Sequence, residues 1–295
     1  MSFVKKLYAL LRSFTDLLLY GNFWIAAGAS AMAIVSLYLT KGNWEADHSV
    51  GFLFFSTLLV YSLHRIVGLQ KAKGVRMTER YKIIERYKQH IVLYAVLSVL
   101  GCLYFFFQMQ IKTQLFIVGL GLVSIAYVLP VFKGKRLRDF NFVKVFVVAL
   151  TWSAICCLMP LVNAGHDIGW VHYLYFAENI FFVFAITLPF DIRDMKLDDF
   201  VGVKTLVISL GKPKSFLLVR FALGIAFLLS VGLSVEKGDM SYAISRFIIY
   251  LFLFFYVPRL KEEMNDYYFS GVLDGTLILG PLLLILMHLI FGGLM

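Results

Sequence analysis

Long apolar runs alternate with short polar segments along almost the whole chain. A helix that crosses a bilayer needs about 20 predominantly apolar residues. By this length rule the pattern predicts about nine transmembrane helices, near residues 21–40, 50–70, 91–109, 114–132, 142–162, 171–190, 214–235, 242–260 and 272–294. Residues 3–20 are amphipathic to apolar, which predicts a helix lying at the membrane surface before the first span.

Composition supports the membrane interpretation. Of the 295 residues 60% are hydrophobic and only 16% are charged, which is far more apolar than a soluble domain of this length. The net charge of +10 lies in the segments between the apolar runs, so it indicates membrane topology and not a nucleic-acid partner. No linker rich in Pro, Gly or Ser divides the chain. We therefore expect an all-α polytopic membrane protein with a single domain, residues 1–295.

The basic residues fall into every second loop between the predicted spans. The other loops hold little more than Lys41, Lys112 and Lys237, mixed with acids. Because basic loops stay on the cytoplasmic side, this alternation predicts a cytoplasmic N-terminus in an inner (cytoplasmic) membrane, which we expect to be bacterial. For the basic run 71–88 we favour attraction to anionic lipid head groups. The basic loops contain Lys5, Lys6, Arg12; Lys71, Lys73, Arg76, Arg80, Lys82, Arg86, Lys88; Lys133, Lys135, Arg136, Arg138; Arg193, Lys196, Lys204, Lys212, Lys214; and Arg259 and Lys261.

The most informative segment is a group of acids after the sixth predicted span. Asp191, Asp194 and Asp198 are spaced i, i+3 and i+7, so on a helix they share one face. Clustered carboxylates repel one another unless a cation lies among them, and hard oxygen ligands of this kind suit Mg²⁺, which bridges carboxylates to a substrate phosphate. The pattern therefore predicts a metal site in an enzyme that acts on a diphosphate. The alternative is a solvated acidic turn between two spans.

Several basic residues near predicted span ends are candidate phosphate contacts, each with a simpler alternative. Arg65 is a planar donor suited to phosphate. Its neighbour His64 is either a proton carrier or a structural histidine at the membrane interface. Lys204 follows Gly202, where the backbone can approach a ligand closely, but a lone lysine at such a position also suits snorkelling. Lys144 begins a span and either snorkels or faces a cavity.

On these residues the chain resembles the UbiA superfamily of intramembrane prenyltransferases. The residues that carry the resemblance are the run from Asp191 to Leu206 and the following Leu210-Gly211, which are close to the second aspartate-rich motif of the family. The segment from Tyr127 to Arg138 is similar to the loop after the fourth helix of the family, and Lys144 with Trp152 to its fifth helix. The nine predicted spans and the cytoplasmic motif loops also fit.

The resemblance implies a bundle of nine helices around a central cavity that opens to lipid. It implies Mg²⁺ held by aspartates, in this chain Asp191, Asp194 and Asp198, and a prenyl diphosphate donor. The diphosphate leaves, an allylic carbocation forms, and an aromatic or other lipophilic acceptor attacks it. The candidate donor-binding residues are Arg193, Lys204, Arg138, Arg65, Tyr127 and Lys144.

The chain departs from the family at the first aspartate-rich motif. That motif would fall near Tyr61 to Lys71, where the sequence contains no acid. Either Arg65, His64 and Lys71 replace the charge of one metal ion, or the protein is a non-catalytic relative that binds an isoprenoid diphosphate lipid, or the substrate differs. A transporter is a further alternative, although the acids cluster at the membrane edge and not at mid-membrane. The acceptor and the length of the prenyl chain stay open.

Overall fold

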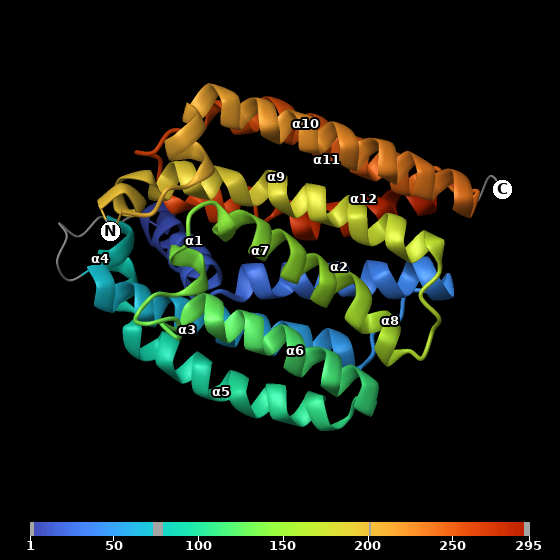
Figure 1. Cartoon of the computed structure of the whole chain (residues 1–295), viewed down its shortest axis with the longest axis horizontal. Helices are drawn as coiled ribbons and strands as arrows, with labels where there is room; N and C mark the ends of the chain where they lie inside the picture. Colours follow the sequence, from blue (N-terminus) through green and yellow to red (C-terminus); the bar gives the residue numbers. More distant parts are fainter. Residues whose placement is uncertain (1–2, 73–78, 201, 292–295) are drawn as a thin grey trace.

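The computed structural model describes residues 3–72, 79–200 and 202–291 as an all-helical bundle (Figure 1). In chain order its elements are α1 (Phe3–Tyr20), α2 (Phe23–Lys41), α3 (His48–Ala72), α4 (Glu79–Arg86), α5 (Lys88–Phe107), α6 (Ile111–Val128), η1 (Leu137–Asp139), α7 (Val143–Ser153), η2 (Ala154–Leu158), α8 (Met159–Asn163), α9 (Trp170–Phe200), α10 (Leu206–Lys237), α11 (Ser241–Tyr256), η3 (Val257–Arg259), η4 (Tyr267–Gly271) and α12 (Thr276–Phe291).

Within the described residues, nine helical segments are long and apolar enough to cross a membrane. Six of these spans are α2, α3, α5, α6, α9 and α10. The fifth span joins α7, the π-turn η2 and α8, the eighth joins α11 and η3, and the ninth joins η4 and α12. The predicted number of spans and the all-α class are confirmed, and the chain is an integral membrane protein. Lys73 and Arg76 of the predicted basic run lie outside the described residues, and the side chains of Lys71 and Arg80 are not described.

The acidic segment lies on a helix and not in a loop. The sixth span was expected to end at residue 190, but α9 continues to Phe200 and carries all three aspartates on its last turns. Pro189 lies inside α9 and removes one backbone hydrogen bond without ending the helix. The three aspartates beyond it are paired with Lys144 and Arg193, so a helical face of three acids is stable at this point.

The seventh span also begins earlier than expected, at Leu206 in place of residue 214. Thr205 caps this helix, since its side-chain oxygen accepts a hydrogen bond from the backbone N–H of Ile208 at 3.3 Å. Gly211 then interrupts the helical backbone with φ 78° and ψ 160°, a conformation open to glycine, and Pro213 follows where the helix restarts. The Leu206–Leu210 stretch is thus a short helical turn ahead of the membrane-crossing part.

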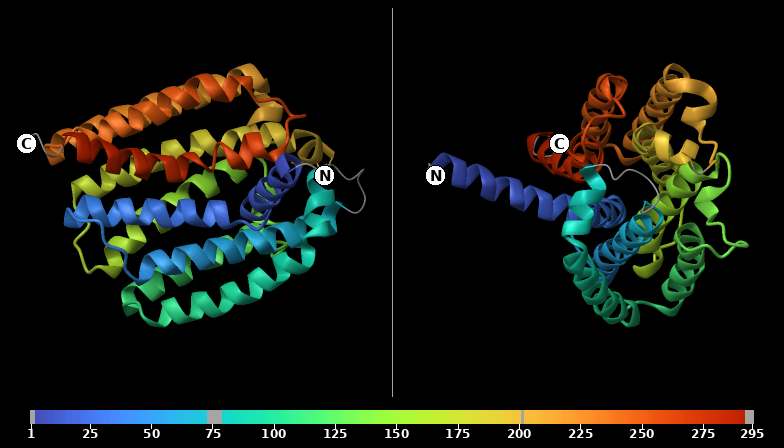
Figure 2. Two further views of the ribbon diagram at one scale, coloured as in Figure 1. Left: turned by 180° about the vertical axis from the view of Figure 1, so that it is seen from behind. Right: turned by 90° about the vertical axis from the view of Figure 1, so that its left-hand side faces the viewer.

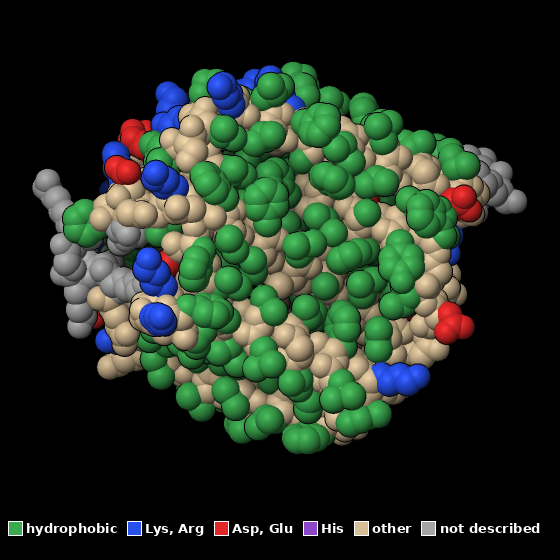
Figure 3. All heavy atoms as spheres, viewed as in Figure 1, with side chains coloured by type: hydrophobic (Ala, Val, Ile, Leu, Met, Phe, Trp, Pro, Cys, Tyr) green, Lys and Arg blue, Asp and Glu red, His purple; other side chains and the backbone are tan. Residues whose placement is uncertain are grey.

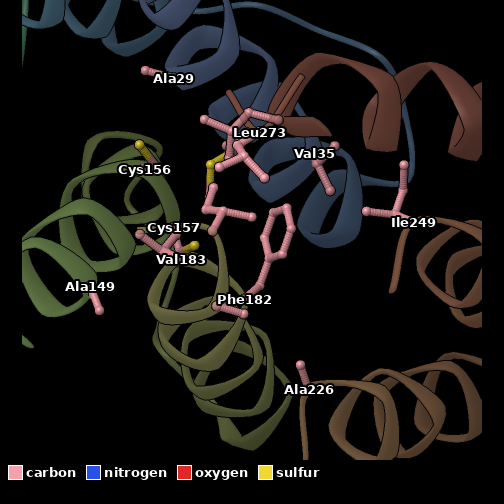
Figure 4. Packing of buried hydrophobic residues seen from close by; sticks show 14 of the residues in the cluster. Ala29, Val35, Ala149, Cys156, Cys157, Phe182, Val183, Ala226, Ile249 and Leu273 are labelled. Carbon is pink, nitrogen blue, oxygen red and sulfur yellow. The ribbon is translucent and has the colours of Figure 1, made fainter. Parts of the chain in front are cut away.

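Close helix packing in the core depends on small residues. α9 packs against α10 and α7, and α2 packs against α3 and α12. Ala29 of α2, Ala149 of α7 and Ala226 of α10 are buried in the cluster that Figure 4 shows, together with Cys156 and Cys157. A side chain at Gly28 would come within 2.9 Å of Leu277 Cβ, so α2 and α12 approach as closely as glycine permits.

The surface separates into an apolar girdle and a basic end. Figure 3 shows hydrophobic side chains spread over the length of the helices on the face in view. Leu122 and Phe221 are two of the exposed hydrophobic residues. Lys and Arg side chains gather at the end of the bundle that carries α4, η1 and the last turns of α9, which we call the basic end. α1 projects sideways from this end with Leu10 and Phe14 exposed, as expected of a helix at the membrane surface (Figure 2).

Candidate functional site

A cavity opens among the helices near the basic end. Its walls come from α2, α3, α6, η1, α7, α9 and the segment of η4 and α12, and they enclose about 1350 Å³, part of it open to the surroundings. Charged side chains line its part nearest the basic end, and apolar side chains such as Val147, Val183 and Ile186 line the part further along the helices. The space suits a ligand with one charged end and one apolar end.

The three aspartates of α9 converge on the ammonium of Lys144 from α7. Lys144 Nζ lies 2.7 Å from Asp191 Oδ1, 2.9 Å from Asp198 Oδ2 and 3.9 Å from Asp194 Oδ2. The predicted shared face of the helix is therefore confirmed. Asp191 is 1% exposed and Lys144 is 7% exposed, so these are buried charges. We call the point among the three carboxylates, which Lys144 Nζ occupies, the cation position.

Three carboxylates surround the cation position. Lys144 pairs with Asp191 and Asp198, and Arg193 pairs with Asp194. Burial in a medium of low dielectric makes the mutual repulsion of these carboxylates strong. Asp191 Oδ1 is buried, and the ammonium of Lys144 lies 2.7 Å from it. A ligand that binds this oxygen therefore has to displace the ammonium.

Arg193 is engaged within the same helix end. Its Nε lies 3.0 Å from Asp194 Oδ1, its Nη2 donates to Asp194 Oδ2 at 3.3 Å, and its Nη1 donates to Asp266 Oδ1 at 3.0 Å. The guanidinium also stacks on Phe190, with 4.8 Å from its central carbon to the ring centre. Arg193 lines the cavity, but its geometry makes it a residue that orients Asp194 more than a mobile phosphate contact.

A second group of cations lies on the walls formed by α3 and η1. Arg65 Nε donates to Asn22 Oδ1 at 2.6 Å, and its Nη2 donates to the backbone carbonyl of Leu19 at 2.9 Å. Arg138 contacts His64 and stacks over Tyr127 at 5.5 Å. The structure thus brings Arg65, Arg138 and Tyr127 of the predicted residues to the cavity, together with His64.

Two predicted residues lie elsewhere. Lys204 is exposed and does not line the cavity, and its backbone carbonyl accepts a hydrogen bond from the backbone N–H of Phe142 at 3.0 Å. Asp198 is also outside the cavity lining. Because it contacts Lys144, it borders the cation position without facing the cavity. The Gly202–Lys204 segment therefore positions the end of α9 against the start of α7.

The structure adds cavity residues that the sequence interpretation missed. Asp274, between η4 and α12, lines the cavity and lies near enough to Arg193 and Arg65 to interact with both electrostatically. Asn22 lies in the turn between α1 and α2, where its φ of 66° is a left-handed conformation that asparagine tolerates. An acid within an apolar span indicates either a structural ion pair or a functional site, and the position of Asp274 on the cavity wall favours the second.

The donor set at the cation position suits Mg²⁺ in kind. Its carboxylates are hard oxygen ligands on one helix face, and two of them, Asp191 and Asp194, line the cavity. Among the described residues, however, no three His, Cys, Asp or Glu side chains form a ready metal cluster. The three aspartates are arranged around an ammonium, and a metal ion would have to replace it.

No family model and no curated protein matches the chain. Solved structures do match. A UbiA homolog from Aeropyrum pernix K1 aligns with a TM-score of 0.64 at 10% identity, covering 92% of this chain and 98% of that chain. A UbiA homolog from Archaeoglobus fulgidus, solved with DMAPP and Mg²⁺, aligns at 0.61 and 13% identity over 94% and 99%. A digeranylgeranylglyceryl phosphate synthase aligns at 0.58 and 16% identity over 93% and 98%.

These alignments span almost the whole of both chains. The TM-scores of 0.58–0.64 show a shared arrangement of the helices, and at identities of 10–16% the chemistry has to be argued from the residues. The resemblance suggested by the aspartate-rich segment and the nine spans is thereby confirmed for the architecture: this chain has the fold of the UbiA homologues.

Proposed function

We propose that this protein is a Mg²⁺-dependent prenyltransferase that moves an isoprenyl group from a prenyl diphosphate to a lipophilic acceptor within the membrane. The observation that carries this proposal is the convergence of Asp191, Asp194 and Lys144 on the wall of a cavity whose remaining length is apolar. Support comes from the fold, because the Archaeoglobus fulgidus homolog was solved with GPP and Mg²⁺ and with DMAPP and Mg²⁺.

The charged part of the cavity suits the diphosphate. Arg138 and Arg65 present guanidinium groups, which match phosphate oxygens in a planar fork. When bound, Mg²⁺ would neutralise charge on the leaving diphosphate, with Asp191 and Asp194 as its protein ligands. Arg193 holds Asp194 in place through two contacts of 3.0 and 3.3 Å, so that carboxylate needs little reorganisation.

The apolar part of the cavity suits the prenyl chain and its cation. Heterolysis of the bond between C1 and oxygen leaves the electron pair on the diphosphate and an allylic cation in the cavity. The rings of Tyr61 and Trp152 line the space in edge-to-face contact, with centroids 6.2 Å apart, and can stabilise that cation without reacting. An electron pair of the acceptor then forms the new bond to C1, and the acceptor loses a proton. The surrounding Val147 and Val148 keep water from the cation.

The test compares two aspartates of α9, Asp194 and Asp199. We expect Asp194→Asn to lower diphosphate release by about 10³-fold, because the neutral amide is a poor ligand for the ion that stabilises the leaving group. Asp199→Asn is the matched control, since Asp199 is exposed at the same helix end. Purified protein is incubated with Mg²⁺, prenyl diphosphates of several lengths and a membrane extract as the source of acceptors, and released diphosphate is measured. Full activity in a folded Asp194→Asn variant would remove the proposed role.

A second candidate is a protein that binds an isoprenoid diphosphate lipid without turning it over. The observation in its favour is the first-motif segment, where residues 61–70 give the cavity Tyr61, His64 and Arg65 but no carboxylate. The same assay separates the two candidates. Binding of a prenyl diphosphate with no release over a broad panel of acceptors favours the lipid-binding protein, whereas measured release excludes it.

A further inference from the structure

We propose that Lys144 and the divalent ion compete for the cation position, and that the ammonium leaves it only when a diphosphate is present to receive it. Metal binding would then depend on the donor substrate. This inference rests on the proposed function for the identity of the ligands, and it concerns a step before any chemistry. It follows from the geometry of Lys144 and its three carboxylates.

The ammonium and a metal ion cannot share the cation position. Lys144 Nζ is within 2.7 Å of Asp191 and 2.9 Å of Asp198. Mg²⁺ takes its oxygen ligands at about 2.0–2.1 Å, so it would lie at almost the same point and carry charge of the same sign. Two cations at that separation repel strongly in a buried site. Occupation by the ion therefore requires Lys144 to move away.

Lysine is the side chain that can make this movement. Its ammonium is a point charge on a flexible stem of four carbons, whereas the guanidinium of Arg193 is fixed by Asp194 and Asp266. Lys144 is on the first turn of α7 and lines the cavity, so its ammonium can turn from the carboxylates toward a ligand in that space.

A buried ammonium does not leave three carboxylates without a new partner, because an unpaired buried charge is costly. The diphosphate supplies that partner. The exchange then keeps every charge paired, since the ion takes the carboxylates while the ammonium binds a phosphate oxygen. In the absence of diphosphate the ion has to displace Lys144 with no compensation, and it binds weakly.

The experiment measures Mn²⁺, as a probe for Mg²⁺, bound to the full-length protein in detergent by equilibrium dialysis with and without inorganic pyrophosphate. Lys144→Met removes the ammonium and keeps the length of the side chain. Without pyrophosphate we expect Lys144→Met to bind Mn²⁺ at least ~10-fold more tightly than the unaltered protein. With pyrophosphate the unaltered protein binds Mn²⁺ at least as tightly as the variant, because only the unaltered protein has the ammonium that binds a phosphate oxygen. Lys214→Met, at an exposed lysine of α10, is the matched control and leaves Mn²⁺ binding unchanged.

Equal or weaker Mn²⁺ binding by Lys144→Met without pyrophosphate overturns the inference, because Lys144 would then not compete with the ion. If the variant unfolds without metal, thermal unfolding replaces dialysis: competition predicts a larger rise of Tm with Mn²⁺ than in the unaltered protein, and an equal rise overturns it. The result is independent of turnover. If Lys144→Met binds Mn²⁺ more tightly but no diphosphate release is found, the proposed function is wrong and this inference stands. If the protein releases diphosphate but the two proteins bind Mn²⁺ equally without pyrophosphate, this inference is wrong and the proposed function stands.

Discussion

Two clusters of buried charge within the described helices differ in their position, since one faces the cavity and the other lies away from it. Far from the basic end, Glu178 of α9 faces Arg246 of α11, with 3.4 Å between Oε1 and Nε. Tyr242 donates to Glu178 at 2.9 Å and accepts from Arg246 at 3.0 Å, and Asn179 donates to Glu178 at 2.7 Å. One carboxylate thus meets one guanidinium, and the pair is outside the cavity lining.

The cluster at the cation position is built differently. Asp191, Asp194 and Asp198 surround the ammonium of Lys144, Asp194 is also paired with Arg193, and two of these acids line the cavity. Burial is similar in the two clusters, since Glu178 is 0% and Asp191 is 1% exposed. The contrast teaches that an intramembrane acid is not by itself a sign of a ligand site. A group of carboxylates that faces open space is the feature that distinguishes the candidate cation site from a structural ion pair.

The strongest test of this contrast breaks the balanced pair. Arg246→Met leaves the carboxylate of Glu178 buried without its cation, and breaking a buried pair in this way costs about 3–5 kcal/mol. We expect a marked fall in Tm, measured by thermal unfolding in detergent, and no change in Mn²⁺ affinity. The double variant Glu178→Gln with Arg246→Met removes both charges and should recover part of the loss. A change in Mn²⁺ affinity would show that the two clusters are coupled and would contradict the distinction between them.

A smaller effect is expected from removing a basic side chain of the cavity wall. Arg138→Ala removes a guanidinium from the wall of the cavity, and a hydrogen bond to a charged group contributes about 1.5–3 kcal/mol. We therefore expect pyrophosphate to bind about 10-fold or more weakly, as measured by isothermal titration calorimetry. Lys135→Ala, an exposed position in the same loop, is the control. Equal affinity in Arg138→Ala and Lys135→Ala would place the diphosphate away from η1.

The smallest expected effect concerns Asp274. This side chain lines the cavity from the segment between η4 and α12, and Arg193 and Arg65 interact with it electrostatically. Without direct contact to the ion, the negative charge of Asp274 contributes about 1 kcal/mol to the free energy of Mn²⁺ binding. We therefore expect Asp274→Asn to weaken Mn²⁺ binding in the presence of pyrophosphate a few-fold. A loss as large as that of Asp194→Asn would make Asp274 a metal ligand. It would then supply the acid that the first-motif segment lacks.

Local patterns in the sequence determined much of the fold. The apolar runs set nine spans, because each helix must satisfy its backbone within the bilayer and needs a fixed length to cross it. The spacing of Asp191, Asp194 and Asp198 placed the acids on one helix face, as the common contact with Lys144 confirms. Helix ends were harder to predict: α9 runs past the expected end at residue 190 as far as Phe200, because its charges are paired by other helices.

Only the tertiary structure decided which charges meet. Lys144 and Asp198 are 54 positions apart, and nothing in either local sequence specifies that they form an ion pair. The same holds for Asp274 and Asn22, which the packing of α2 and α12 brings to the cavity, and for Lys204, which it leaves exposed. Helix periodicity is a property of neighbours along the chain, whereas the partner of a buried charge depends on how whole helices pack. For that reason the sequence predicted a place for a cation, and the fold showed that a lysine already holds it.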